Sequence, residues 1–361
     1  MSNIPPTDLI EEEIQDASIG EDEEASTDVR YQVSSYGADY PVDGLVKRLI
    51  NDDIILPKFQ REFVWPQTQA SKFIESLLLG LPVPAIFLSK DVSTQKLQVI
   101  DGQQRLKSLK FFYEGVFHKK AFSLIGVNKE FEGSTYKSLK DEDRRRLDDA
   151  IIHAIIIRQD DPRNDDSSDF LVFERLNTTS TPLSEQEIRA CVCHGSFNEY
   201  LHKANENSAW RAIYGDVNTR QKDTELLLRF FALYFDFASY ERPMKLFLTR
   251  YMKKNRNLNL HSADILDKVF KPTIELANNQ LGRETFRPQR ALNASVTDSI
   301  LVGTAKRLAT GSISNLAGYK NAIQQAIQSP QFMDLYRGGT TNKDRLESRI
   351  KCIVDALATL Q

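Results

Sequence analysis

The sequence predicts an α+β fold in which a small α/β domain precedes an all-α domain. Strand-like and helix-like segments alternate between residues 36 and 162, whereas the periodic segments from 163 to 361 all have helical spacing. Before them, residues 1–35 are predicted to be a disordered acidic segment, because residues 1–30 are acidic and lack aromatic residues, a composition that is usually disordered. The predicted domains are therefore 1–35, 36–162 and 163–361.

The bulk composition is that of an ordinary soluble globular protein, with 361 residues, 41% hydrophobic and 27% charged. The start of the chain lacks the pattern of a secretory signal, and no apolar run approaches the roughly 18 residues of a membrane span. Three cysteines, Cys191, Cys193 and Cys352, do not make a disulfide framework. We therefore expect a cytoplasmic protein with no membrane partner.

The charge is unevenly distributed along the chain. The first thirty residues hold ten acidic residues and a single base, Arg30, and so carry a net charge of -9. Since the whole chain carries -3, the remainder carries +6. Solubility is the favoured role for the acidic segment; competition with polyanions for a basic groove is the alternative.

The elements of the α/β domain can be assigned in order along the chain. Residues 42–53 place Leu45, Val46, Leu49 and Ile50 on one helical face, and residues 54–57 form a short strand ending at a proline. The next helix begins near Pro66 and ends at Gly80. Its buried stripe is predicted to comprise Ala70, Phe73, Ile74, Leu77 and Leu78.

Two strands then follow, at residues 84–90 and 96–101, and lead into a helix that buries Leu106, Leu109, Phe112 and Tyr113. A β-branched run near residues 150–160 predicts a covered strand, with His153 packed in the core. Beyond it, Ser184 and Glu187 are predicted to form a capping box. The segment CVCH at 191–194 is interpreted as buried small residues on a helix, not as a zinc site.

The stretch QVIDGQQRLKSL, residues 98–109, places polar residues at a strand-to-helix corner. Asp101 could cap the helix and Gln104 could complete a capping box. Arg105 does not fit that interpretation, because a positive charge in the first turn opposes the helix dipole.

A phosphate site removes this conflict. The free amides of a helix start bind anions, Gly102 allows close approach, and Arg105 adds a bidentate fork. Gln103 and Gln104 would then contact a base, a sugar or a water, and Asp101 would hold a metal ion or orient a water. A second pair, Gln60 and Arg61 in PKFQREFVW, could point into the same cleft.

Three segments of the chain together resemble a known family. They are LPKFQREFVWPQTQASKFIESLLLGLPVPAIFL, VIDGQQRL and FERLNTTSTPLSEQEIR, in that order and at these spacings. The chain resembles the N-terminal domain family of the GmrSD-type restriction endonucleases, whose members carry the DGQQR motif. This resemblance implies a ParB/sulfiredoxin-like fold for the α/β domain and covers about residues 40–200.

The resemblance also implies a nucleotide site at the DGQQR corner, with nucleotide hydrolysis coupled to recognition or cutting of DNA in a restriction or phage-defence system. It assigns catalytic roles to Asp101, Gln104 and Arg105, with Asp101 as a magnesium ligand. It assigns nucleotide binding to Gln60, Arg61, Gly102, Gln103, Arg105 and Ser108. Further motif residues are Phe173, Glu174, Arg175, Asn177, Glu187 and Arg189. The family commonly continues RLTTL, whereas Lys107 and Ser108 stand here, so a hydroxyl role at position 107 is in doubt.

Three functions stay open on the sequence. The first is an NTP-binding and NTP-hydrolysing defence protein, with Mg²⁺ and an unspecified base, that acts on DNA alone or with a partner protein. The second is a non-catalytic ParB-like module that binds DNA or protein, and the third is a stand-alone metal-dependent nuclease. A histidine-dependent nuclease module of HNH type is not expected, because none of the five histidines lies beyond His261.

Overall fold

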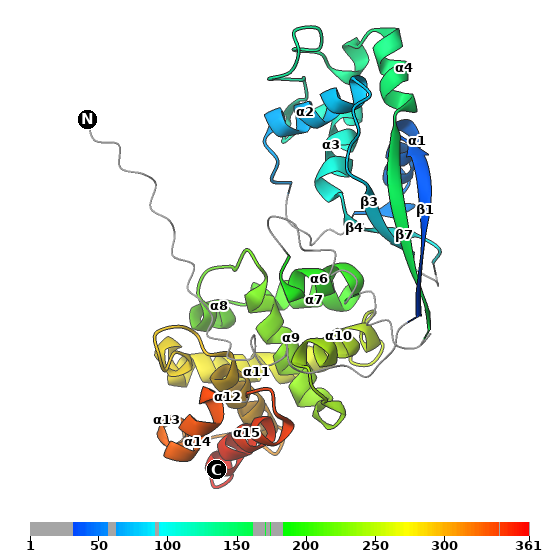
Figure 1. Cartoon of the computed structure of the whole chain (residues 1–361). Coiled ribbons are helices and arrows are strands. Elements are labelled where there is room, and N and C mark those ends of the chain that lie inside the picture. The colour runs from blue at the N-terminus through cyan, green and yellow to red at the C-terminus, as the bar shows by residue number, and fades with distance from the viewer. Residues whose placement is uncertain are drawn as a thin grey trace, which may run out of the picture. The chain divides into compact units, whose positions relative to one another are not determined.

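The computed structural model describes residues 32–56, 63–90, 94–161, 170, 174, 183–338 and 340–360 (Figure 1). They fall into two compact units, one ending at Val192 and the other beginning at Cys193. The first unit combines a sheet with helices, and the second is built of helices. The predicted fold class, a small α/β part followed by an all-α part, is confirmed.

A mixed five-stranded sheet forms the framework of the N-terminal unit. Its strands lie in the order β1-β7-β3-β4-β2. The pairs β1–β7 and β3–β4 are antiparallel, whereas β7–β3 and β4–β2 are parallel. The bounds are Gln32–Pro41 for β1, Ile54–Ile55 for β2, Ile86–Lys90 for β3, Leu97–Asp101 for β4 and Ile151–Asp161 for β7.

Four helices pack together with this sheet around one hydrophobic core. They are α1 (Val42–Ile50), α2 (Gln67–Leu78), α3 (Gln103–Glu114) and α4 (Asp141–Asp149). A small hairpin, β5 (Val116–Phe117) and β6 (Lys120–Ala121), follows α3, and a short 3₁₀ turn, η1 (Tyr136–Ser138), precedes α4. The predicted stripe of α2 is buried along its whole length, from Ala70 to Leu78.

The structure corrects three expectations about this unit. Strand β1 begins at Gln32, within the segment expected to be disordered; it is a polar edge strand, so its sequence lacks the alternation that marks a half-buried strand. His153 is exposed and pairs with Asp39, because its neighbours Ile152 and Ala154 occupy the inward positions of β7. Ile50 is also exposed, since it lies in the last turn of α1.

Helix α6 (Glu185–Val192) belongs to the N-terminal unit although it lies well beyond the last strand. The side-chain amide of Gln98, in the middle of β4, donates a hydrogen bond to the carbonyl of Cys191. Ser184 and Glu187 form the predicted capping box, with Glu187 Oε2 2.6 Å from the Ser184 amide and Ser184 Oγ 3.2 Å from the Glu187 amide. The unit therefore extends past residue 162, where the strand signals stop.

The C-terminal unit is organised around a central helix, α12 (Ala294–Leu308), whose residues from Ala294 to Ala305 are all buried. Arg229 and Asp298 join it to α9 through a salt bridge of 2.6 Å that is almost fully buried. The other helices are α7 (Ser196–Asn205), α8 (Ser208–Tyr214), α9 (Lys222–Phe235), α10 (Met244–Lys254), α11 (Ala263–Leu281), α13 (Leu316–Gln328), α14 (Pro330–Arg337) and α15 (Lys343–Leu357). Among the described residues, none of the helices is long and apolar enough to cross a membrane.

The core of the N-terminal unit predicts a large difference between two truncations. Leu109→Ala, at a site with no exposed surface, should lower the free energy of unfolding by about 2–5 kcal/mol because it leaves a cavity. Val116→Ala, at a site that is 48% exposed, should change it by less than about 0.5 kcal/mol. Urea titrations followed by circular dichroism measure both, and equal midpoints for the two variants would contradict the assigned core.

Candidate functional site

The DGQQR motif forms the corner between β4 and α3. Strand β4 ends at Asp101, Gly102 is the N-cap residue, and α3 begins at Gln103. No side chain caps the helix, so the capping interpretation of Asp101 and Gln104 is wrong. Asp101 lies one position too early to act as the cap, and its carboxylate pairs with Arg105 instead.

The amino end of α3 therefore keeps free backbone donors. The first intrahelical bond runs from the amide of Leu106 to the carbonyl of Gly102. The amides of Gln103, Gln104 and Arg105 find no acceptor within the described parts of the chain. Three N–H groups and the positive end of the helix dipole thus coincide at this corner.

Gly102 is required by the geometry of the corner. Its φ of 98° lies in the left-handed region, which favours glycine. A Cβ atom at this position would lie 2.5 Å from Cγ2 of Ile86 at the start of β3. The absence of a side chain is what allows the corner to close against the neighbouring strand.

Arg105 is held by the protein itself. Its Nη2 lies 2.7 Å from Asp101 Oδ2, and its Nη1 donates to the carbonyls of Pro84 and of Ala85, the latter at 3.0 Å. The guanidinium side chain is 12% exposed, whereas the carboxylate of Asp101 is 41% exposed. Burial lowers the pKa of Arg105, and the charge of Asp101 acts in the opposite direction. Arg105 thus joins the corner to the segment that leads into β3.

The two glutamines have different surroundings. Gln104 Oε1 accepts hydrogen bonds from the amides of Val64, at 3.1 Å, and Trp65, at 3.3 Å. Gln103 is 8% exposed, and its side-chain Nε2 is buried without a hydrogen-bond partner among the described residues. Ser108 is buried and donates to the carbonyl of Gln104 within the helix. Of these three side chains, Gln103 is the one whose donor is buried without a partner among the described residues.

Gln60 and Arg61, predicted to face the same cleft, lie outside the described residues. Val64, which Gln104 holds, follows Arg61 by three residues in the sequence. The place of Gln60 and Arg61 in the same cleft stays a prediction.

The downstream motif residues divide into two groups. Phe173, Arg175 and Asn177 lie outside the described residues, whereas Glu174 is helical and half-buried. Glu187 caps α6, and Arg189 is fully buried, with its Nε 2.9 Å from Gln186 Oε1 and its guanidinium 5.7 Å from the centre of the Phe170 ring. In this geometry Glu187 and Arg189 stabilise α6.

Among the residues that the structure describes, metal ligands do not gather at the corner. Within the described ranges, no group of three or more His, Cys, Asp or Glu side chains could hold a metal ion. Asp101 is the one acidic residue of the DGQQR motif, and its carboxylate forms a salt bridge with Arg105. Sequence reasoning also missed the contacts of this corner with Pro84, Ala85, Val64 and Trp65, because backbone partners leave no mark in residue identity.

A comparison with protein families matches residues 43–193 to the GmrSD restriction endonuclease, N-terminal domain. Residues 43–193 belong to this family. The GmrSD-type domain thus includes the DGQQR corner, all four helices around it and α6, and it ends beside the boundary between the two compact units. Strand β1 precedes the matched segment. This match associates residues 43–193 with the restriction systems after which the domain is described.

No curated protein matches the chain. The family assignment therefore rests on the match over residues 43–193. The roles of individual residues rest on the geometry described above.

The two left-handed glycines that flank α3 predict a graded effect. Gly115→Ala should cost about 1–2 kcal/mol, because Gly115 has a φ of 73° but no neighbouring atom within 4 Å of a new Cβ. Gly102→Ala should cost a further 1–3 kcal/mol, roughly, because the same change also overpacks against Ile86. Thermal and urea unfolding of the two variants measure this difference. If Gly102→Ala were the milder change, the close approach of the corner to β3 would be refuted.

Proposed function

We propose that the GmrSD-type domain binds a nucleotide with its phosphates at the amino end of α3, as part of a restriction or defence system. The observation that carries this proposal is the set of three free amides at Gln103, Gln104 and Arg105, on a helix that no side chain caps. Such amides, with the helix dipole behind them, bind phosphate oxygens. The buried side-chain amide of Gln103, which has no partner among the described residues, adds a fourth donor to the same turn of α3.

Arg105 would join this site by exchanging partners. Its Nη2 holds a carboxylate that is 41% exposed, and a phosphate oxygen offers the same charge and hydrogen-bond geometry as that carboxylate. Its Nη1 would keep the two backbone carbonyls of Pro84 and Ala85. Binding would then release Asp101 while the guanidinium stays anchored to the start of β3.

Hydrolysis of the bound nucleotide is the finer part of the proposal. Released from Arg105, the carboxylate of Asp101 would be available to position a water or Mg²⁺. Mg²⁺ is commonly held by one or two carboxylates together with phosphate oxygens and waters, so a single acidic side chain fits this role. We propose ATP, GTP or CTP as substrates and DNA or a partner protein as the target.

A second candidate is a module without catalytic activity, in which the corner is structural or holds a nucleotide without turnover. The internal contacts of Arg105 favour it, because a guanidinium engaged at both Nη atoms already has partners. In that case the domain would bind DNA or protein through another surface.

The discriminating experiment compares Arg105→Ala and Asp101→Ala with Arg145→Ala, an exposed arginine of α4 that serves as the control. In a thermal-shift assay with and without Mg²⁺, ATP, GTP and CTP should raise the melting temperature of the wild type and of the control. Arg105→Ala should weaken nucleotide binding at least about tenfold, since a charged hydrogen-bond donor is lost. Asp101→Ala should bind at least as tightly as the wild type, because it frees Arg105, yet lose turnover.

The outcomes separate the two candidates. Nucleotide binding by every variant without turnover supports the module without catalytic activity. If neither the wild type nor any variant binds a nucleotide, while Arg105→Ala and Asp101→Ala both lower the melting temperature, Arg105 is a structural latch and the nucleotide proposal is refuted.

A further inference from the structure

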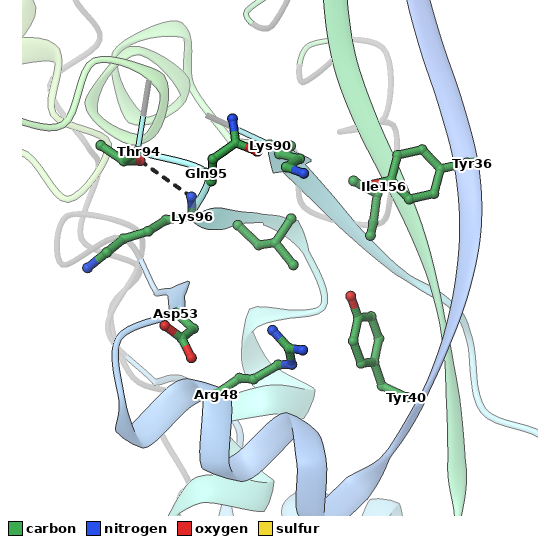
Figure 2. A pocket seen from close by; sticks show the side chains of 10 residues that line it. Tyr36, Tyr40, Arg48, Asp53, Lys90, Thr94, Gln95, Lys96 and Ile156 are labelled. Carbon is green, nitrogen blue, oxygen red and sulfur yellow. Dashed lines mark hydrogen bonds between the residues drawn. The ribbon is translucent and has the colours of Figure 1, made fainter. Parts of the chain in front are cut away.

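A pocket of about 420 Å³ lies at the other end of β4 from the DGQQR corner (Figure 2). It includes Leu97, the first residue of β4, whereas the corner begins at Asp101, the last. Four residue steps of strand, about 13 Å, separate the two places. The pocket is therefore distinct from the corner.

The strand register explains why a hollow forms here. Tyr36 of β1 pairs with Ile156 of β7, Ile156 pairs in turn with Leu88 of β3, and Lys90 pairs with Leu97. Ile156 and Leu97 are buried and belong to the floor of the pocket. Arg48, from the last turn of α1, lines the same pocket. The pocket thus lies at the carboxyl end of α1, beside strands β1, β7 and β3.

The lining is rich in cations. Arg48, Lys90 and Lys96 face the pocket together with one acid, Asp53. None of the three cationic side chains forms an ion pair or a side-chain hydrogen bond with any residue that the structure describes. Arg48 lies 5.5 Å from the centre of the Tyr40 ring and complements the carboxyl end of α1. Lys90 and Lys96 line the pocket without a helix end to complement, so an anionic ligand would give their charges a partner.

Two tyrosines supply the aromatic part of the lining. Tyr36 and Tyr40 lie four residues apart on β1 and so share one face of the strand. Figure 2 shows both rings on one side of the pocket, Lys96 and Asp53 on the other, and Arg48 between them. The Tyr36 side chain is 46% exposed, so a planar ring can reach it.

We propose that this pocket binds a phosphorylated nucleoside, either free or as one unit of a DNA strand. Its phosphate would contact Arg48, Lys90 and Lys96, whose unpaired charges suit an anion, and its base would stack on Tyr36. The volume lies within the range of about 300–1,000 Å³ found for small-molecule sites. The inference does not depend on nucleotide binding at the DGQQR corner.

The test changes Lys90 and Lys96 to glutamine together, and compares this variant with a double change of Lys119 and Lys120, two exposed lysines of the β5–β6 hairpin. The probes are thymidine 5′-monophosphate and a 5′-labelled single-stranded 12-mer, measured by calorimetry and fluorescence anisotropy on the full chain. We expect Lys90→Gln with Lys96→Gln to weaken binding at least tenfold and to reduce its dependence on salt, whereas the hairpin variant should behave as the wild type. Circular dichroism verifies that both variants are folded.

Acetylation of lysines, mapped by mass spectrometry, locates the bound probe. A ligand in the pocket should protect Lys90 and Lys96 and leave Lys119 and Lys120 reactive, and Tyr36→Ala should weaken binding of the mononucleotide but not of inorganic phosphate. Protection by the mononucleotide supports a free ligand, and protection by the 12-mer alone supports a DNA strand. If neither probe protects Lys90 and Lys96, or if the two double variants bind alike, the pocket is not a nucleotide site and the proposal is overturned.

Discussion

The contacts of a single guanidinium hold the DGQQR corner against the segment that leads into β3. Arg105 joins Asp101 at the end of β4 to the carbonyls of Pro84 and Ala85 just before β3. These contacts exist because Gly102 has no side chain to separate the corner from Ile86. The corner between β4 and α3 is therefore held by a partly exposed ion pair, while the apolar face of α3 packs in the core. In the proposed nucleotide complex, a phosphate would replace the carboxylate at this ion pair.

Strand β4 has a proposed anion site at each end, and the two sites differ in the kind of hydrogen-bond donor they offer. At its carboxyl end the donors are backbone amides, which are fixed in place by α3 and carry no net charge. At its amino end the donors are the side chains of Arg48, Lys90 and Lys96, which carry full charges. Amides on a rigid helix favour one geometry of phosphate, whereas lysines accept many. If both regions bind nucleotides, the corner is the more selective of the two, and the pocket is the one more sensitive to salt.

The sequence predicted what depends on local pattern. The stripe of α2, the strands β3, β4 and β7 and the capping box of Ser184 and Glu187 all follow from spacing along the chain, and the structure confirms them. Strand β1 was missed because a polar edge strand is stabilised by its pairing with β7, more than a hundred residues away. The partners of Arg105 and Gln104 were missed for the same reason: they are backbone atoms brought close by the fold. The roles assigned to Gln60, Arg61, Phe173, Arg175 and Asn177 stay predictions, since these residues lie outside the described ranges.

The DGQQR corner also shows what a local conflict in a sequence can and cannot establish. An arginine in the first turn of a helix opposes the dipole, and on the sequence that conflict was the main argument for a phosphate. The structure resolves it within the protein, because the carboxylate of Asp101 lies 2.7 Å from the guanidinium and supplies the missing negative charge. Arg105 alone is therefore no longer evidence for a ligand. The argument passes to the amides of Gln103, Gln104 and Arg105, which no described residue satisfies and which a structural latch does not require.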